Sequence, residues 1–217
     1  MSGHDGGEAQ AIVDACRAMN ASGLNQGTSG NVSVRRGDGM LITPSGVPYD
    51  ATTPDMLVAV GPDGGSEGPL KPSSEWRMHL AIYADRPEAG AVVHVHSPYA
   101  TALSCHRRGI PAFHYMVAAA GGPDIRCADY ATFGTEALSG AMAAALAGRA
   151  ACLLANHGQI AFGPTLDKAL WLAGEVETLA RQYLLALGLG APVELDGAEM
   201  DRVLALFATY GQPPAKA

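Results

Sequence analysis

Residues 90–103 read GAVVHVHSPYATAL, and they place two histidines, His94 and His96, one residue apart at the end of a short valine-rich run. A β-branched run of this length, preceded by Pro and Gly, predicts a strand over about 91–96. Because successive side chains along a strand alternate between its two faces, both imidazoles are expected on the same face. A same-face pair at a strand end can chelate a metal, although two histidines can also stand together by chance on an exposed face.

A third histidine follows another apolar run. In LLANHGQIAFG, residues 153–163, His157 comes after a strand predicted over 151–155 and directly before Gly158. This histidine could cap the turn or join the first two. If it joins them, three neutral imidazoles and one carboxylate form a site suited to zinc, or to another divalent first-row metal such as Mn²⁺ or Co²⁺.

The candidate carboxylate is Glu75, in PSSEWRMHLAIYADRP, residues 72–87. Pro and Ser at the start of this stretch and Pro at its end predict a helix. Ser73 is expected to cap the helix, which would place Glu75 in the first turn and leave backbone N–H groups free for a phosphate. Ser and Glu are also favoured at helix starts for structural reasons alone. His79 lies one helical turn after Glu75 and is expected to pack or hydrogen-bond there.

Two loops have a composition that suits an anion. TSGNVSV, residues 28–34, and ITPSG, residues 42–46, bring small polar side chains together with a permissive backbone. Loops of this kind can direct several N–H and O–H donors at one anion. The same residue types also occur in ordinary turns. No GKS or GKT sequence follows, so nucleotide hydrolysis is not indicated.

The composition limits the class of protein. The 217 residues are 48% hydrophobic and 16% charged, which is enough for one sizeable core, so we expect a single domain over 1–217. A net charge of −7 without a basic cluster argues against a nucleic-acid partner. The N-terminal residues lack the features of an export signal and no long apolar stretch occurs, so we expect no membrane association and a cytoplasmic protein. The cysteines are widely spaced and are interpreted as reduced core thiols; they are Cys16, Cys105, Cys127 and Cys152.

Helical and strand patterns are interleaved along the chain. Helices are predicted over about 8–23, 72–87, 98–107, 134–148, 165–188 and 196–208. Strands are predicted over about 31–36, 40–46, 56–60, 91–96, 150–156 and 159–163. This order mixes hairpins with helices, so we expect an α/β protein whose sheet is covered by helices on both faces.

Several longer motifs together resemble the class II aldolase/adducin family. They are GLNQGTSGNVSVRRGDGMLITPSGVPYD, PSSEWRMHLAIY, AVVHVHSPYATALS, IPAFHYMVAAAGG, YATFGT and NHGQIAFGPTLDKALWLAGEVE. The similarity covers nearly all of residues 10 to 210 and is greatest to members that cleave L-fuculose 1-phosphate. The resemblance implies a three-layer α/β/α subunit with a central mixed, largely antiparallel sheet, and assembly into a cyclic homotetramer.

The resemblance also implies the site residues. Zinc would be bound by His94, His96 and His157, with Glu75 as the fourth ligand. A phosphate pocket would comprise Thr28, Asn31, Ser45, Gly46, Ser73 and Ser74. Tyr115 would act in a neighbouring subunit's site, and Tyr210 corresponds to a tyrosine on a mobile C-terminal tail, here from about residue 209.

The implied activity is reversible, metal-dependent cleavage of a ketose 1-phosphate to dihydroxyacetone phosphate and an aldehyde. Tyr115 would handle the proton of the C4 hydroxyl, and Glu75 would protonate the carbanion carbon. Candidate substrates are L-fuculose 1-phosphate, 5-deoxyribulose 1-phosphate and 5-methylthioribulose 1-phosphate. Alternatives within the family are a sugar-phosphate epimerase, methylthioribulose-1-phosphate dehydratase and a non-catalytic adducin-like module, although the adducin branch lacks the metal histidines. Schiff-base chemistry needs a desolvated lysine, and none is expected among Lys71, Lys168 and Lys216.

Overall fold

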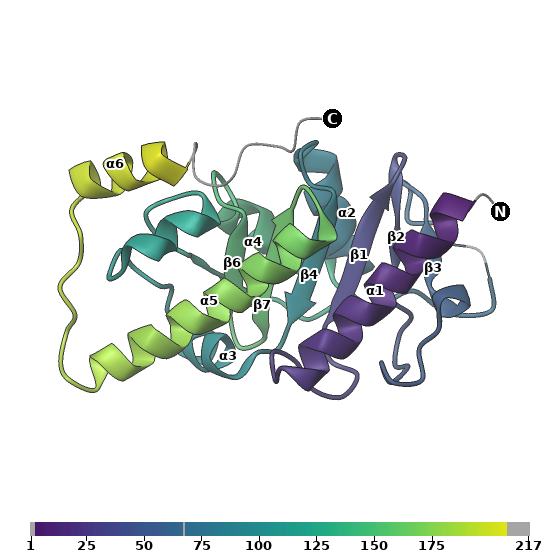
Figure 1. The fold of residues 1–217 in the computed structure, drawn as a ribbon, viewed down its shortest axis with the longest axis horizontal. Coiled ribbons are helices and arrows are strands. Elements are labelled where there is room, and N and C mark those ends of the chain that lie inside the picture. Colours follow the sequence, from purple (N-terminus) through teal and green to yellow (C-terminus); the bar gives the residue numbers. More distant parts are fainter. Residues whose placement is uncertain (1–2, 67, 208–217) are drawn as a thin grey trace.

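The computed structural model describes residues 3–66 and 68–207, which are built around one sheet (Figure 1). Its strands lie in the order β3-β2-β1-β4-β7-β6-β5. They are β1 Asn31–Arg36, β2 Gly39–Ile42, β3 Val58–Val60, β4 Ala91–Val95, β5 Cys127–Ala128, β6 Ala151–Leu154 and β7 Gly158–Gly163. The α-helices are α1 Gly3–Ala21, α2 Trp76–Asp85, α3 Pro98–Cys105, α4 Glu136–Ala145, α5 Leu166–Leu187 and α6 Gly197–Phe207. Two short 3-10 helices are η1 Pro54–Met56 and η2 Tyr115–Ala120.

The pairing of the strands confirms a mixed, largely antiparallel sheet. All neighbouring strands are antiparallel except β5 and β6, which are parallel. In the β1–β4 pair, Asn31 lies opposite His94. In the β4–β7 pair, Val95 lies opposite Gln159. The register therefore brings the loop before β1 and the start of β7 beside the histidine pair.

The valines of β4 show how the layers are organised. Val93 and Val95 pack into a core with α1, α3 and α5, whereas Val92 packs into a second core with α2 and α4. Helices α1 and α5 cross one face of the sheet, and α2 and α4 lie on the other, which confirms the expected three layers (Figure 1). His94 is two residues after Val92 on the same strand, so its side chain lies on the same face of the sheet as Val92, the face covered by α2. None of the described helices combines the length and the apolar character needed to cross a bilayer.

The start of α2 differs from the sequence prediction. The helix begins at Trp76, and Glu75 rather than Ser73 occupies the capping position, without a side-chain capping bond. The Ser73 hydroxyl oxygen instead accepts the N–H of Glu75 at 3.3 Å, and the Ser73 carbonyl accepts the N–H of Trp76 at 3.1 Å. A tight turn stabilised by these bonds precedes the helix, so the prediction that Ser73 is its N-cap is wrong.

Besides η1, whose Met56 was expected at the start of a strand, two short elements were not predicted. The apolar segment 110–122 contains η2, whose start is capped by the ring of His114, which accepts the N–H of Met116 at 3.2 Å. Strand β5 has only two residues and exists because it pairs with β6. Both depend on contacts with distant parts of the chain or on local side-chain bonding, neither of which produces a periodic pattern.

The cysteines only partly match the expected core thiols. All four are unpaired, and Cys16 and Cys152 are buried. Burial raises the pKa of the Cys16 thiol to about 12, so this group is inert at neutral pH. Cys105 is exposed and Cys127 is half-buried, so the prediction of a core position is wrong for Cys105.

Candidate active site

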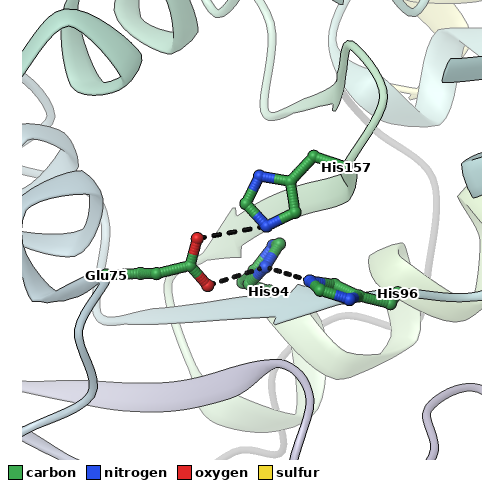
Figure 2. Close-up of side chains that lie close together, drawn as sticks. All are labelled: Glu75, His94, His96 and His157. Atoms are coloured by element: carbon green, nitrogen blue, oxygen red, sulfur yellow. Dashed lines mark hydrogen bonds and ion pairs between the residues drawn. The ribbon is translucent and has the colours of Figure 1, made fainter. Parts of the chain in front are cut away.

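Four side chains from three separate segments of the sequence converge beside the C-terminal end of β4, the central strand of the sheet (Figure 2). His94 and His96 come from the end of β4, His157 from the turn between β6 and β7, and Glu75 from the residue before α2. Their candidate ligand atoms all lie within 4.8 Å of one another. His94 Nε2 lies 3.1 Å from His96 Nε2, which confirms that the two imidazoles share a face.

The carboxylate of Glu75 bridges two of the rings. Its Oε2 atom lies 3.1 Å from His94 Nε2, and its Oε1 atom lies 3.1 Å from His157 Nε2. Figure 2 shows both oxygens directed at the imidazoles, with His96 completing the group. This arrangement brings three nitrogen donors and one carboxylate together, which is a donor set that zinc and similar divalent ions prefer.

The tautomer of His94 supports a cation site. His94 Nδ1 lies 2.8 Å from the carbonyl oxygen of Gln159, which can only accept, so Nδ1 carries the hydrogen. In the neutral ring, Nε2 therefore presents a lone pair to the carboxylate oxygen of Glu75. An imidazole lone pair and a carboxylate oxygen that face each other in a buried site need a cation between them, either a proton on Nε2 or a metal ion. Burial opposes the protonated ring, but the adjacent Glu75 carboxylate raises the pKa of His94. A carbonyl partner on the remote ring nitrogen is also typical of metal-binding histidines.

The electrostatics of the group keep Glu75 ionised. Burial opposes the charged form, but the His94 and His157 rings together hold the pKa of Glu75 well below its usual range. Burial and the neighbouring imidazoles of His94 and His157 lower the pKa of His96 to about 4, so this ring is neutral at pH 7. A divalent metal that displaced the protons of His94 and His157 would therefore meet an anionic carboxylate and the lone pairs of three neutral imidazoles.

Further buried bonds hold the histidine strand in place. The side-chain oxygen of Asn25 accepts the backbone N–H of His96 at 3.2 Å. The Gln159 amide donates to Ser97 Oγ at 2.8 Å and to the Ala173 carbonyl at 3.0 Å. Sequence reasoning missed Asn25 and Gln159, because nothing in their local context indicates that they would contact the end of β4.

A cavity of about 320 Å³ opens beside the cluster. All six residues predicted for a phosphate pocket line it, together with three of the four candidate metal ligands; these are Thr28, Asn31, Ser45, Gly46, Ser73, Ser74, Glu75, His96 and His157. No Lys or Arg of the described residues lines this cavity. An anion in it would therefore be held by hydroxyl and backbone donors.

The cavity has a wall that sequence reasoning did not assign. Tyr130, Ala131, Phe133 and Asn156 contribute to the lining. Tyr130 and Phe133 are 54% and 65% exposed, so much of each ring is open to a molecule in the cavity. Both occur in the YATFGT motif, so the motif itself was the available signal.

The two candidate tyrosines lie elsewhere. Tyr115 is 51% exposed, and its ring stacks on that of His114 with centroids 4.9 Å apart. It does not belong to the residues that line the cavity of its own chain. Tyr210 and the C-terminal tail from about residue 209 lie outside the described residues. Lys71 and Lys168 are exposed, which matches the prediction for them, whereas Lys216 lies outside the described residues.

A family model for the "Class II Aldolase and Adducin N-terminal domain" matches residues 10–184. The chain belongs to the class II aldolase/adducin family. A 5-methylthioribulose-1-phosphate/5-deoxyribulose-1-phosphate aldolase of Rhodospirillum rubrum is 54% identical over 210 residues, which cover 94% of this chain and 95% of that protein. An L-fuculose phosphate aldolase of Escherichia coli (strain K12) is 54% identical over 204 residues, with coverage of 94% and 95%.

A solved structure named L-fuculose 1-phosphate aldolase has the same fold. It superposes with a TM-score of 0.91 at 39% identity, covering 96% of this chain and 98% of the other. These similarities confirm the expected class II aldolase/adducin fold and the expected class of enzyme, an aldolase.

Proposed function

We propose that the protein is a zinc-dependent aldolase that reversibly cleaves a ketose 1-phosphate to dihydroxyacetone phosphate and an aldehyde. The observation that carries this proposal is the cavity in which a buried carboxylate and three imidazoles adjoin a wall of neutral anion donors. The names of the three relatives described above, each an aldolase of a sugar phosphate, support it.

The metal would be held by His94, His96, His157 and Glu75. Zinc suits this donor set best, and Mn²⁺ or Co²⁺ are the alternatives. A divalent ion bound there would act as a Lewis acid on the substrate's C2 carbonyl.

The phosphate of the substrate would bind at the other end of the cavity. Hydroxyl donors are supplied by Thr28, Ser45, Ser73 and Ser74. Gly46 has no side chain, so an anion can come close to its backbone. Ser73 suits this role because its oxygen already accepts an N–H from the chain, which leaves its hydroxyl hydrogen free to donate. Asn31 lines the same cavity, and its Nδ2 atom lies 3.1 Å from Glu75 Oε2.

Two proton transfers complete the reaction. Tyr115 would relay the proton of the C4 hydroxyl to water as the C3–C4 bond breaks, and C4 would leave as the aldehyde carbonyl. The electron pair of that bond remains on C3, in conjugation with the C2 carbonyl. Glu75, which faces the cavity as a carboxylate, would take up a proton from water and pass it to C3, and so give dihydroxyacetone phosphate. The reverse sequence is an aldol addition.

The aldehyde end of the substrate would face Tyr130 and Phe133. Their exposed rings offer an apolar surface for a short tail such as methyl or methylthiomethyl. This surface is compatible with L-fuculose 1-phosphate, 5-deoxyribulose 1-phosphate and 5-methylthioribulose 1-phosphate, which share the phosphate and the carbonyl end. Side-by-side kcat/KM values for the three substrates test the proposal. Cleavage of none of them would contradict it.

The active protein is proposed to be a cytoplasmic homotetramer with shared sites. The support is that Tyr115 is half exposed and lies apart from the cavity of its own chain. Mixing inactive Tyr115→Phe subunits with inactive Glu75→Gln subunits should restore part of the activity, because some interfaces would pair an intact Tyr115 with an intact Glu75. No recovery in verified mixed tetramers would place both residues in one subunit's site.

A further inference from the structure

A second group of polar side chains is buried next to Glu75, between α2 and β1. Asn31 and Ser33 share one face of β1, and His79 and Tyr83 lie one helical turn apart on α2. Their exposed fractions are 2%, 0%, 0% and 3% in that order. Burial of polar side chains is costly unless they are paired, and the proposed reaction uses only Asn31 among them.

These side chains form a continuous line of hydrogen bonds that ends on Glu75. The hydroxyl of Tyr83 lies 2.8 Å from Ser33 Oγ, which lies 2.7 Å from His79 Nδ1. His79 Nε2 lies 2.6 Å from Asn31 Oδ1. Asn31 Nδ2 lies 3.1 Å from Glu75 Oε2.

The donor or acceptor character of each atom determines which partner donates in every hydrogen bond of this line. The Glu75 carboxylate can only accept, so Asn31 must turn its NH₂ group toward it and its oxygen toward His79. An amide oxygen also only accepts, so His79 carries its hydrogen on Nε2. His79 is neutral, because burial and the neighbouring His94 lower its pKa to about 3. Its Nδ1 atom therefore accepts from the Ser33 hydroxyl, and Ser33 in turn accepts from Tyr83.

Asn31 matters for Glu75 because the other contacts of the carboxylate are with metal ligands. His94 and His157 would use their Nε2 lone pairs for the metal and have no hydrogen there to donate. Among the described residues, Asn31 Nδ2 is then the N–H group that donates to the Glu75 carboxylate. This bond can orient the Glu75 carboxylate during proton transfer to the substrate carbon.

We propose that His79 is a positioning residue, which fixes the Asn31 amide in the orientation that keeps an N–H donor on Glu75. This inference rests on the proposed function, because it assigns a role to Glu75 in proton transfer. Without the His79 donor, the amide could turn over and present its oxygen to the carboxylate. The Asn31 amide oxygen and the Glu75 carboxylate, both acceptors, would then face each other, and Glu75 would lose its hydrogen bond from Asn31.

The tautomer of His79 gives a first test, which does not depend on activity. A ¹H–¹⁵N spectrum of the zinc-loaded wild-type protein, labelled with ¹⁵N-histidine, should show a neutral His79 ring with its hydrogen on Nε2. A hydrogen on Nδ1, or a doubly protonated ring, would overturn the proposal. This measurement decides the matter even where a variant does not fold.

Two variants give a second test. Glutamine at position 79 can place an amide nitrogen near the position of Nε2, whereas leucine is of similar size and cannot donate. His79→Leu should lower the rate at which the protein exchanges hydrogen from the hydroxymethyl carbon of dihydroxyacetone phosphate into deuterated water by about 10- to 100-fold. His79→Gln should recover most of this loss. Bound zinc per chain and KM should stay close to the wild-type values in both.

The control variant is Ile82→Val, on the same helix. Ile82 is buried at 2% exposure and belongs to the apolar core, so this change loosens the packing of α2 without removing a hydrogen bond. It should leave the exchange rate unchanged. Equal rates for His79→Leu and Ile82→Val, no recovery in His79→Gln, or loss of zinc from His79→Leu would each overturn the positioning role. A wild-type protein that catalyses no exchange would instead contradict the proposed function.

Discussion

Replacing Glu75 with glutamine perturbs the proposed chemistry with little change in shape. The amide has the volume of the carboxylate, and one orientation satisfies its neighbours. Its oxygen can accept from Asn31 Nδ2, which lies 3.1 Å from the carboxylate oxygen that it replaces, while the histidine lone pairs remain available for the metal. We therefore expect Glu75→Gln to fold normally, with a melting temperature close to that of the wild type.

The expected loss of activity is large. Removing a positioned general acid or base costs about 10²- to 10⁴-fold in rate. Because each tenfold change corresponds to about 1.36 kcal/mol, this range is about 2.7–5.4 kcal/mol of activation free energy. Glu75 is only 6% exposed, so water has little access to replace it. We therefore expect turnover to fall by about 10³-fold or more, with KM little changed because the phosphate donors are intact.

The assay follows the release of dihydroxyacetone phosphate by coupling it to an NADH-dependent dehydrogenase. Glu199→Gln is the matched control, because it makes the same chemical change in a surface ion pair with Arg202 and lies outside the cavity lining. It should keep wild-type turnover. Turnover of Glu75→Gln within about tenfold of the wild type, with metal bound, would refute the assignment of proton transfer to Glu75.

Other predictions concern the pocket, the backbone and the thiols. Ser73→Ala should raise KM for the phosphorylated ketose by about 10-fold or more, because a hydrogen bond to a charged group is lost; equal cleavage of unphosphorylated ketoses would count against the phosphate pocket. Gly30→Ala should destabilise the protein by about 2–4 kcal/mol in denaturant unfolding. Its φ is +70°, and an added Cβ would lie 2.5 Å from the His94 carbonyl oxygen, so an unchanged midpoint would contradict this packing. A thiol reagent should modify Cys16 and Cys152 only after denaturation, since both are buried; rapid reaction in the native protein would contradict their placement.

The sequence predicted the parts of the fold that produce a periodic pattern. The strand ending at His96 has alternating faces, so the shared direction of His94 and His96 followed from spacing alone. The N-cap of α2 was predicted at Ser73, two residues before its observed position at Glu75. Ser73 has the identity of a good N-cap, but its hydroxyl and carbonyl oxygens stabilise a turn before the helix. Residue identity therefore indicated a helix start without fixing its position.

Contacts between layers could not be read from the sequence. His79 was expected to pack or hydrogen-bond near Glu75, but its partners Asn31 and Ser33 lie more than forty residues away on β1. Their contact depends on how α2 packs on the sheet. The same limit applies to Gln159, whose carbonyl sets the tautomer of His94 across the β4–β7 pair. The metal ligands were named from the resemblance, and only the structure shows that they converge.

The most direct test of the proposed function is to measure bound metal and activity together. Protein freed of metal by chelation should cleave no ketose 1-phosphate, and activity should rise in proportion to added zinc until one ion is bound per chain. His94→Ala should bind little metal and remain inactive, whereas His106→Ala, outside the ligand cluster, should bind one ion and keep its activity. A metal-free preparation with full activity would contradict the account.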